Sequence, residues 1–511
     1  MPRRPKPSDP TDARTHVAIR DLSFAYDASE RPLFANVSVQ LPPGFTGVIG
    51  ANGSGKTTLL QLLLGRLQPD GGRIERPEHT WYCPQRTDEP PQTLRAFLDD
   101  WSGEACALRG KLGVETDWLD RWHSLSHGER KRAQIAQALW REPDLLALDE
   151  PTNHIDAGAR DLLIDALARY RGVGVIVSHD RELLDALVAQ CVWIEPPGVI
   201  VTPGSYDRSR ALRAEATESI ARSREKLRKE TQRLREEQVR RRQRAAGEHA
   251  RRSKRGIDRG DHDAKEKIDR ARVTDGGAAA PLKRISSALQ RKQEEFDATR
   301  TAKVHETGVW LETTHSQRDF VLQVDAGACA LDGQRRLVWP AVRIAAQDRI
   351  ALVGANGAGK TTLLNRWLGD LNAPAERIVY LPQEISAHAS RDLLAQIRDL
   401  PNDKQGMVLS IVSRLNSRPD RLLASDEPSP GEARKLLLAL GILRAPHVIV
   451  LDEPTNHLDL PSIEALEGAL RNCPCALILV SHDARFVSAV GARRWPLAAE
   501  TATEVRLRPD L

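Results

Sequence analysis

An internal repeat constrains this 511-residue chain more than any other feature of its sequence. The run VIGANGSGKTTLL at 48–60 recurs as LVGANGAGKTTLL at 352–364. Three more pairs follow in the same order: YCPQ and YLPQ, ending at Gln85 and Gln383; LLALDEPTNHID and VIVLDEPTNHLD, beginning at Leu145 and Val448; VIVSHD and LILVSHD, ending at Asp180 and Asp483. Four motifs in one order, twice, predict a tandem duplication with an insert between the copies.

Each copy alternates short apolar runs with helical patterns. GFTGVIG, DLLALDE and GVGVIVSHD predict buried parallel strands that present chemistry at their carboxyl ends. The expected fold class is therefore α/β, with a ligand at the carboxyl edge of each parallel sheet. The expected organisation is a disordered tail, a first domain, a basic helical linker and a second domain, at 1–15, 16–204, 205–305 and 306–511.

The pattern GxxxxGK[ST] occurs at 50–57 and at 354–361, directly after a predicted strand each time. Its glycines let backbone N–H groups curl around a phosphate, and the following helix directs its positive end at the same place. Lys56 and Lys360 are predicted to neutralise the β- and γ-phosphates of ATP, while Thr57 and Thr361 hold Mg²⁺. The full predicted set is Gly50, Asn52, Gly53, Gly55, Lys56, Thr57 and Thr58, with Gly354, Asn356, Gly357, Gly359, Lys360, Thr361 and Thr362.

An acidic pair ends the second predicted strand of each copy. Asp149 and Asp452 are predicted to bind Mg²⁺, directly or through water. Glu150 and Glu453 come next and are placed to orient or deprotonate an attacking water. An isolated Asp-Glu after a strand would favour a solvated turn, but the preceding phosphate loop and the following PTNH favour catalysis.

With these motifs in order, the chain resembles an ATP-binding cassette ATPase. The wording EPTNHLD, two cassettes on one chain and a charged linker resemble the ABC-F branch, whose members are translation factors and antibiotic-resistance proteins acting on ribosomes. The resemblance implies two tandem P-loop cassette domains joined by an antiparallel helical-hairpin linker. It covers the chain from about residue 17 onward.

The resemblance also implies roles for further residues. Gln85 and Gln383 would help to bind Mg²⁺ and would sense both this ion and the γ-phosphate. His179 and His482 would contact the γ-phosphate. The signatures, Ser126, Gly128 and Glu129 in the first copy and Ser429, Gly431 and Glu432 in the second, would each close over ATP bound by the other cassette. Two ATP would be sandwiched in a monomer by intramolecular pairing, and hydrolysis would let the halves separate.

The two copies depart from the family pattern at two places. His127 and Pro430 stand where the signature usually has Gly, and Pro430 removes one backbone N–H while suiting the first turn of a helix. Tyr26 lies where the family stacks a ring on adenine, whereas the same offset in the second copy gives Ala330, with no aromatic nearby. The sequence therefore predicts unequal nucleotide affinity, with both glutamates active.

The linker carries an excess of positive charge. Residues 205–305 hold 29 Lys or Arg against 17 Asp or Glu, while the rest of the chain is net acidic. Ile220, Leu227 and Leu234 predict one apolar seam, and Leu282, Ile285, Leu289 and Phe296 predict a second, as in two antiparallel helices. The expected tip lies roughly between Arg240 and Gly277.

A solvated charged helix is the plain alternative for this linker. Arginine pairs bidentately with phosphate, and the basic run at 240–260 contains no aromatic residue. Contact with the RNA backbone rather than with the bases is therefore favoured. The resemblance adds the ribosome and the peptidyl-site tRNA as the partners. The expected contacts are Arg240, Arg241, Arg242, Arg244, Arg251, Arg252, Lys254, Arg255 and Arg259.

Composition narrows the class of protein further. No apolar run approaches the roughly 20 residues that cross a bilayer, the first residues lack a secretory pattern, and the six cysteines lack zinc-site spacing. A cytoplasmic protein without membrane insertion is expected. The alternatives are the ATP-binding subunit of a membrane transporter, a DNA-associated cassette ATPase, and a binding module without turnover. Housekeeping translation and antibiotic resistance both stay open.

Overall fold

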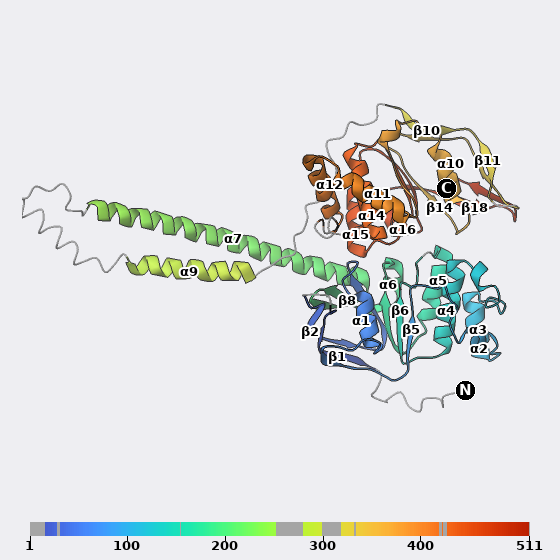
Figure 1. Cartoon of the computed structure of the whole chain (residues 1–511), viewed down its shortest axis with the longest axis horizontal. Helices are drawn as coiled ribbons and strands as arrows, with labels where there is room; N and C mark the ends of the chain where they lie inside the picture. Colours follow the sequence, from blue (N-terminus) through green and yellow to red (C-terminus); the bar gives the residue numbers. More distant parts are fainter. Residues whose placement is uncertain are drawn as a thin grey trace, which may run out of the picture. The chain divides into compact units, whose positions relative to one another are not determined.

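A computed structural model of the chain describes residues 16–27, 31–153, 155–251, 279–298, 318–331, 334–417, 419, 422 and 427–509. It divides into two compact units (Figure 1). One unit combines Met1–Ser209 with His305–Leu511 and holds both copies of the repeat. The other unit is Arg210–Val304. No helix in the described ranges has the length and apolar character that a bilayer crossing requires.

A six-stranded sheet forms the centre of the first copy, in the order β5-β6-β7-β3-β8-β9. Its strands are β3 (Gly44–Gly50), β5 (Thr80–Cys83), β6 (Leu145–Asp149), β7 (Val173–Val177), β8 (Val188–Glu195) and β9 (Gly198–Pro203). All neighbours pair in parallel except β8 and β9. The predicted parallel strands are thus confirmed.

An antiparallel sheet and a set of helices complete the first copy. The sheet has the order β2-β1-β4, from β1 (Val17–Phe24), β2 (Phe34–Leu41) and β4 (Gly71–Glu75). The helices are α1 (Lys56–Leu63), α2 (Leu94–Leu98), α3 (Gly103–Leu112), α4 (His127–Trp140), α5 (Ala157–Leu167), α6 (Arg181–Leu187) and a 3₁₀ turn at Trp122–Ser124.

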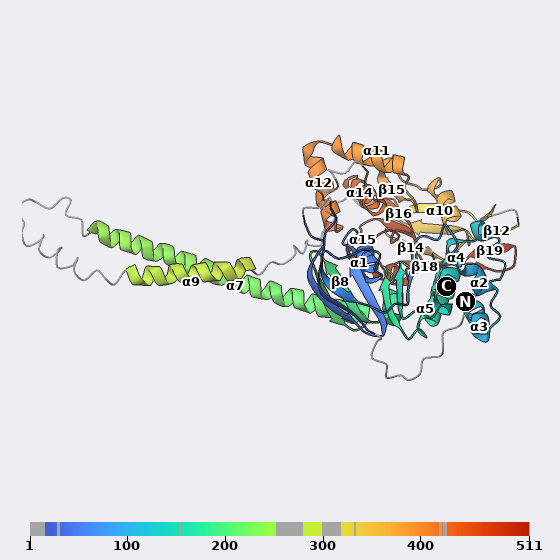
Figure 2. The same cartoon turned by 60° about the horizontal axis from the view of Figure 1, so that its bottom comes forward.

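The second copy repeats the parallel arrangement, as β15-β16-β17-β14-β18 within an eight-stranded sheet that continues through β19, β12 and β11. Its strands are β10 (Phe320–Val324), β11 (Gly327–Ala330), β12 (Arg336–Trp339), β13 (Val342–Ala345), β14 (Arg349–Val353), β15 (Ile378–Leu381), β16 (Val448–Asp452), β17 (Ala476–Val480), β18 (Arg493–Ala499) and β19 (Glu504–Leu507). Its helices are α10 (Lys360–Leu368), α11 (Ala387–Arg398), α12 (Asn402–Arg414), α14 (Pro430–Leu443), α15 (Leu460–Arg471), α16 (Ala484–Ala489) and a 3₁₀ turn at Ala375–Arg377. Helices α11, α12 and α14 pack together (Figure 2).

Both faces of each parallel sheet are buried, which explains the unbroken apolar runs of its strands. In β6, Leu146 and Leu148 belong to one core cluster, while Leu145 and Ala147 belong to the cluster on the opposite face. Strand β16 divides its residues in the same alternating way. The polar residues that follow these strands are therefore held at one edge of a rigid sheet.

The second unit consists of two helices, α7 (Tyr206–Arg251), whose first four residues belong to the cassette unit, and α9 (Ala279–Ala298). They run side by side (Figures 1 and 2). The side chains of Gln238 and Ser286 form a 2.8 Å hydrogen bond, and Arg235 donates to Gln293 at 2.6 Å. As residue numbers rise along α7, partner numbers fall along α9, so the pair is antiparallel.

Two linker predictions need correction. Helix α7 continues to Arg251, so Arg240, Arg241, Arg242, Arg244 and Arg251 lie on a helix and not in a tip loop. Leu227 and Leu234 are half-buried, but Ile220 is 43% exposed and so does not continue the buried seam. Arg252, Lys254, Arg255 and Arg259 lie outside the described residues.

Candidate active sites

Each predicted phosphate loop is a tight turn between a central strand and a helix. Gly55 has φ +100°, and a Cβ there would come within 2.8 Å of the Leu33 side chain, so both the conformation and the space require glycine. Gly359 has the same character, with φ +88° and Leu331 against it. Helices α1 and α10 begin at the next residues, Lys56 and Lys360, so that their N-terminal N–H groups face the turn.

The two lysines curl back over their own loops. Lys56 Nζ donates to the carbonyls of Gly50 and Ala51 at 2.9 and 3.2 Å. Lys360 Nζ donates to Gly354 and Ala355, both at 2.9 Å. Burial lowers the pKa of both lysines, and the neighbouring carboxylates oppose this shift. The ammonium groups therefore lie where phosphate oxygens would be bound.

The carboxylates at the strand ends fit a magnesium ion. Thr57 Oγ1 donates to Asp149 Oδ2 at 3.0 Å, so the predicted ligands of the first site are adjacent. Asp452 is fully buried, and the nearby Thr361 side chain opposes the effect of burial on its pKa, so the predicted ligands of the second site are also neighbours. Burial raises the pKa of both aspartates. A hard divalent cation with oxygen ligands would stabilise their ionised forms.

The neighbouring glutamates are held in a strained backbone conformation. Glu150 and Glu453 have φ +46° and +45°, and their N–H groups donate to Val177 and Val480 of the next strand at 2.8 and 2.9 Å. A non-glycine residue held at positive φ stores strain that is common at functional sites. The turn directs each carboxylate toward the histidine that follows that strand.

The histidines contact these glutamates in both copies. His179 Nε2 lies 3.0 Å from Glu150 Oε1, and His482 Nε2 lies 3.4 Å from Glu453 Oε1. Burial raises the pKa of Glu150 to about 8 and that of Glu453 to about 7. Burial also lowers the pKa of His179 to about 3 and that of His482 to about 4. The histidines are therefore neutral at pH 7.

The two glutamines are positioned through their backbones by buried cations. Lys131 Nζ donates to the carbonyls of Pro84 and Gln85 at 2.7 and 3.2 Å. Arg434 donates to the carbonyls of Pro382 and Gln383 in the second copy. The sequence reasoning did not identify these cations. They could have been found from the sequence, because each lies five residues after the serine of its signature.

Two aspartates that sequence reasoning also missed join the copies. Asp459 Oδ2 accepts the N–H of Asn52 in the first phosphate loop at 2.7 Å. Asp156 Oδ2 accepts the N–H of Asn356 in the second loop at 3.2 Å. Each aspartate also caps its own helix, through Ala159 and Ser462. The signal was the final Asp of DEPTNHID and DEPTNHLD.

Both predicted signatures begin a helix with a capping box. The Ser126 hydroxyl accepts the N–H of Glu129, whose carboxylate accepts that of Ser126. Ser429 and Glu432 do the same with Pro430 in the first turn, as expected for proline. A Cβ on Gly431 would lie 3.6 Å from Asn52 Nδ2, which places the second signature against the first phosphate loop. A Cβ on Gly128 would instead lie 3.9 Å from the side chain of Ile155, a residue of the same cassette.

A cavity of about 650 Å³ adjoins the second phosphate loop and is lined by both copies. The second copy contributes Gln383, Glu453, His482, Leu331, Arg335 and loop residues from Asn356 to Thr362. The first copy contributes Glu150, His179, Asn153 and Arg160, among others. The described lining contains no Phe, Tyr or Trp and none of Ser126, Gly128 and Glu129.

The environments of Tyr26 and Ala330 differ as the sequence suggested. The Tyr26 hydroxyl lies 2.9 Å from Thr58 Oγ1, and its ring stands edge-on to Phe24. The ring is half exposed beside the first phosphate loop. Ala330 ends β11, and Leu331, which follows it, packs against the second loop. The two loops therefore have different side chains at the position expected to meet the base.

Comparison with known proteins agrees with this geometry. The sequence model of a family described as ABC transporter matches residues 34–153 and 341–456. The ribosome protection protein VmlR of Bacillus subtilis is 30% identical over 91% of this chain and 84% of its own length. The tylosin resistance ATP-binding protein TlrC of Streptomyces fradiae is 29% identical over 94% and 96%.

Solved structures share the fold. An archaeal ribosome recycling factor, aABCE1, crystallised with the ribosomal stalk protein aP1, matches with a TM-score of 0.62 and 20% identity. The match covers 95% of this chain and 89% of that one. The RNase-L Inhibitor matches with a TM-score of 0.61 and 20% identity, over 96% and 90%.

Proposed function

The chain belongs to the ABC-F family of tandem-cassette ATPases and is an ATP hydrolase, and from this premise we propose that ATP controls its binding to the ribosome. Two ATP with Mg²⁺ would bind between the cassettes and be hydrolysed to ADP and phosphate. The closed state would bind the ribosome in the cytosol, and hydrolysis would release it. The observation that carries this proposal is that each phosphate loop is bonded across to an aspartate of the other cassette.

Each residue has one role in this cycle. The Lys56 and Lys360 ammonium groups bind phosphate oxygens, and Asp149 with Thr57, or Asp452 with Thr361, would hold Mg²⁺, which neutralises phosphate charge when bound. Glu150 and Glu453 orient and deprotonate the attacking water, because their carboxylates are aimed by the positive-φ turn. The neutral imidazoles of His179 and His482 hold these carboxylates and the γ-phosphate in place.

The ribosome as partner is supported by the relatives and by the linker's charge. VmlR is named for ribosome protection and TlrC for tylosin resistance. Arg240, Arg241 and Arg242 are exposed on α7, and guanidinium groups there suit the phosphates of rRNA or tRNA. We propose that this basic end of the linker makes the RNA contact.

The central test uses hydrolysis-deficient protein. Glu150→Gln with Glu453→Gln removes the bases and keeps the shape, so ATP should trap the closed form. Ribosome co-sedimentation should then rise with ATP and fall with ADP. Co-sedimentation that ignores ATP would contradict ribosome coupling, and preferential retention on duplex DNA would favour a DNA-associated role.

The linker contact is tested in the same trapped protein. Changing Arg240, Arg241 and Arg242 together to Gln should weaken ribosome binding and flatten its salt dependence, with the slope of log K against log salt smaller by roughly 2. Changing Arg222, Arg228 and Arg233 of the same helix to Gln is the matched control. Equal losses in both triple variants would argue against a localised contact.

A further inference from the structure

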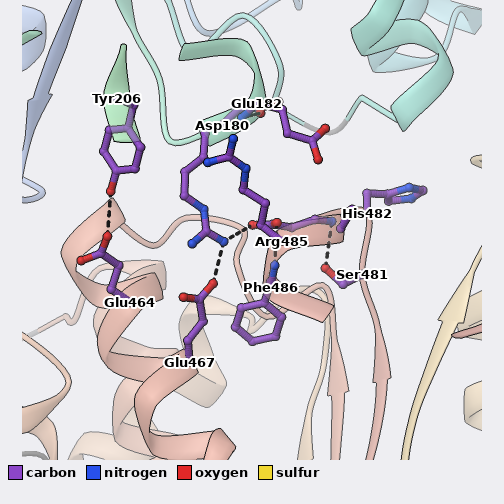
Figure 3. A network of polar contacts seen from close by, with 12 residues as sticks. Asp180, Glu182, Tyr206, Glu464, Glu467, Ser481, His482, Arg485 and Phe486 are labelled. Carbon is purple, nitrogen blue, oxygen red and sulfur yellow. Dashed lines mark hydrogen bonds and ion pairs between the residues drawn. The ribbon is translucent and has the colours of Figure 1, made fainter. Parts of the chain in front are cut away.

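A buried ionic cluster joins the two cassettes (Figure 3). Arg181, the first residue of α6, is 8% exposed. Its Nη2 donates to Glu467 Oε1 on α15 at 2.6 Å and to Asp483 Oδ2 at 3.1 Å. Both acceptors belong to the other cassette. Arginine from one copy is therefore held between two carboxylates of the second.

Asp483 connects this cluster to the catalytic segment of the second cassette. Its Oδ1 caps α16 by accepting the N–H of Phe486 at 2.8 Å, and its own N–H donates to Ser481 Oγ at 3.1 Å. His482, the residue before it, donates its N–H to Glu453 Oε2 at 3.3 Å. Arg181 therefore restrains the backbone that carries the histidine and supports the catalytic glutamate.

The second cassette places no matching arginine against the histidine segment of the first cassette, at 178–180, among the described residues. The position of Arg181 is Ala484 in the second copy. The next residue, Arg485, pairs with Asp185 at 2.7 Å and with Asp207 at 3.0 Å. Asp180, the counterpart of Asp483, pairs with Arg160 of its own cassette at 4.0 Å. Among the described residues, the first histidine segment receives no such cation from the other cassette.

We propose that Arg181 is a positioning residue for hydrolysis at the second nucleotide site, acting through Asp483 on His482 and Glu453. Through Arg181, which lies outside the cavity of the second site, the first cassette thereby controls the geometry of that site, and the control runs one way. The proposal rests on ATP hydrolysis at the second site, a part of the proposed function, and is independent of ribosome binding.

The test isolates turnover at the second site with Glu150→Gln as the parent. Adding Arg181→Gln should lower kcat roughly tenfold or more, with the KM for ATP within about threefold, because Arg181 does not line the nucleotide cavity. Arg181→Lys should restore part of kcat. Arg485→Gln, which removes the neighbouring ion pairs, should leave kcat within about twofold of the parent.

A double-mutant cycle separates positioning from loss of folding. Asp483→Asn keeps a side chain able to cap α16 and removes the charge, so it should lower kcat as Arg181→Gln does. The double variant should be no worse than either single variant, because both remove one interaction. With Glu453→Gln as the parent, adding Arg181→Gln should leave the kcat of the first site within about threefold of the parent's.

Three results would overturn the proposal. Unchanged kcat in folded Arg181→Gln protein would show that the bond does not position the site. Equal losses at both sites, with a matching fall in thermal stability, would reduce Arg181 to an interface contact. A Glu150→Gln parent without ATPase activity would contradict hydrolysis at the second site itself, whereas a loss of ribosome binding alone would leave the proposal standing.

Discussion

Tyr26 and Leu331 show how one side chain distinguishes two otherwise matched sites. Tyr26 stands beside the first phosphate loop with its hydroxyl on Thr58, and its half-exposed ring offers a face to a purine. Leu331 packs against Gly359 and lines the cavity of the second loop together with Arg335. We therefore expect a bound base to meet an aromatic ring at the first site, and an aliphatic side chain with a guanidinium at the second.

Removing the ring should therefore weaken only the first site. In a Lys360→Ala parent, Tyr26→Ala should reduce ATP affinity by about 1–3 kcal/mol, the usual worth of base–aromatic stacking. Tyr26→Phe keeps the ring and loses only the hydrogen bond to Thr58, so its dissociation constant for ATP should stay within about threefold of the parent's. Calorimetric titration measures both. A Tyr26→Phe loss as large as that of Tyr26→Ala would assign the effect to the hydroxyl instead.

At the scale of elements, the linker is a pair of antiparallel helices, α7 and α9. Polar side chains as well as apolar ones contribute to its register. Thr231 is buried on α7 between the half-buried Leu227 and Leu234. Lys292 of α9 approaches Glu230 at 3.4 Å. Such an exposed ion pair contributes little alone, so the paired helices depend mainly on the apolar contacts.

The register predicts one specific cross-link in the full chain. Gln238→Cys with Ser286→Cys should be joined by a short thiol-specific cross-linker, because the side chains at these two positions meet across the helix pair. Glu237→Cys with Ser286→Cys is the control and should not, since a step of one residue turns the side chain by about 100° around the helix. Peptide mass mapping distinguishes the products, and efficient linkage of the control pair would contradict the register.

At the scale of the whole molecule, the two composite sites are similar in plan and different in detail. The contact from Asp459 to Asn52 is 2.7 Å and that from Asp156 to Asn356 is 3.2 Å. Gly431 approaches Asn52, while Gly128 has Ile155 as its neighbour. The phosphate loops and the Asp-Glu pairs that the two copies share are thus placed in two unequal surroundings.

This asymmetry predicts unequal ATP affinities. Lys56→Ala and Lys360→Ala, made separately, each leave one intact site, and calorimetric titration should give dissociation constants that differ more than threefold, or more than about 0.7 kcal/mol. Each glutamate should still support turnover in its own background. Equal affinities in the two variants would show that ring and signature differences cancel.

The local chemistry of this protein could be read from its sequence. The duplicated motifs predicted the strands β3, β6 and β7, the phosphate loops, Glu150 with Glu453, and the place of Pro430 in the first turn of a helix. Each of these depends on residues that are close together in the chain or share one sheet edge. The tip of the linker was expected roughly between Arg240 and Gly277, whereas α7 extends to Arg251, because a charge run by itself carries no signal that stops a helix.

Contacts between distant segments were decided by tertiary structure alone. Asn52 and Asp459 are 407 residues apart, and Arg181 and Asp483 are 302 apart. No periodicity or spacing could pair them, because their meeting depends on how the two copies dock. Once docked, burial removes water from these groups, strengthens their ion pairs and hydrogen bonds, and makes an unpaired partner costly. The sequence by itself determined what each cassette can do, and the docked fold decided which cassette holds which site in place.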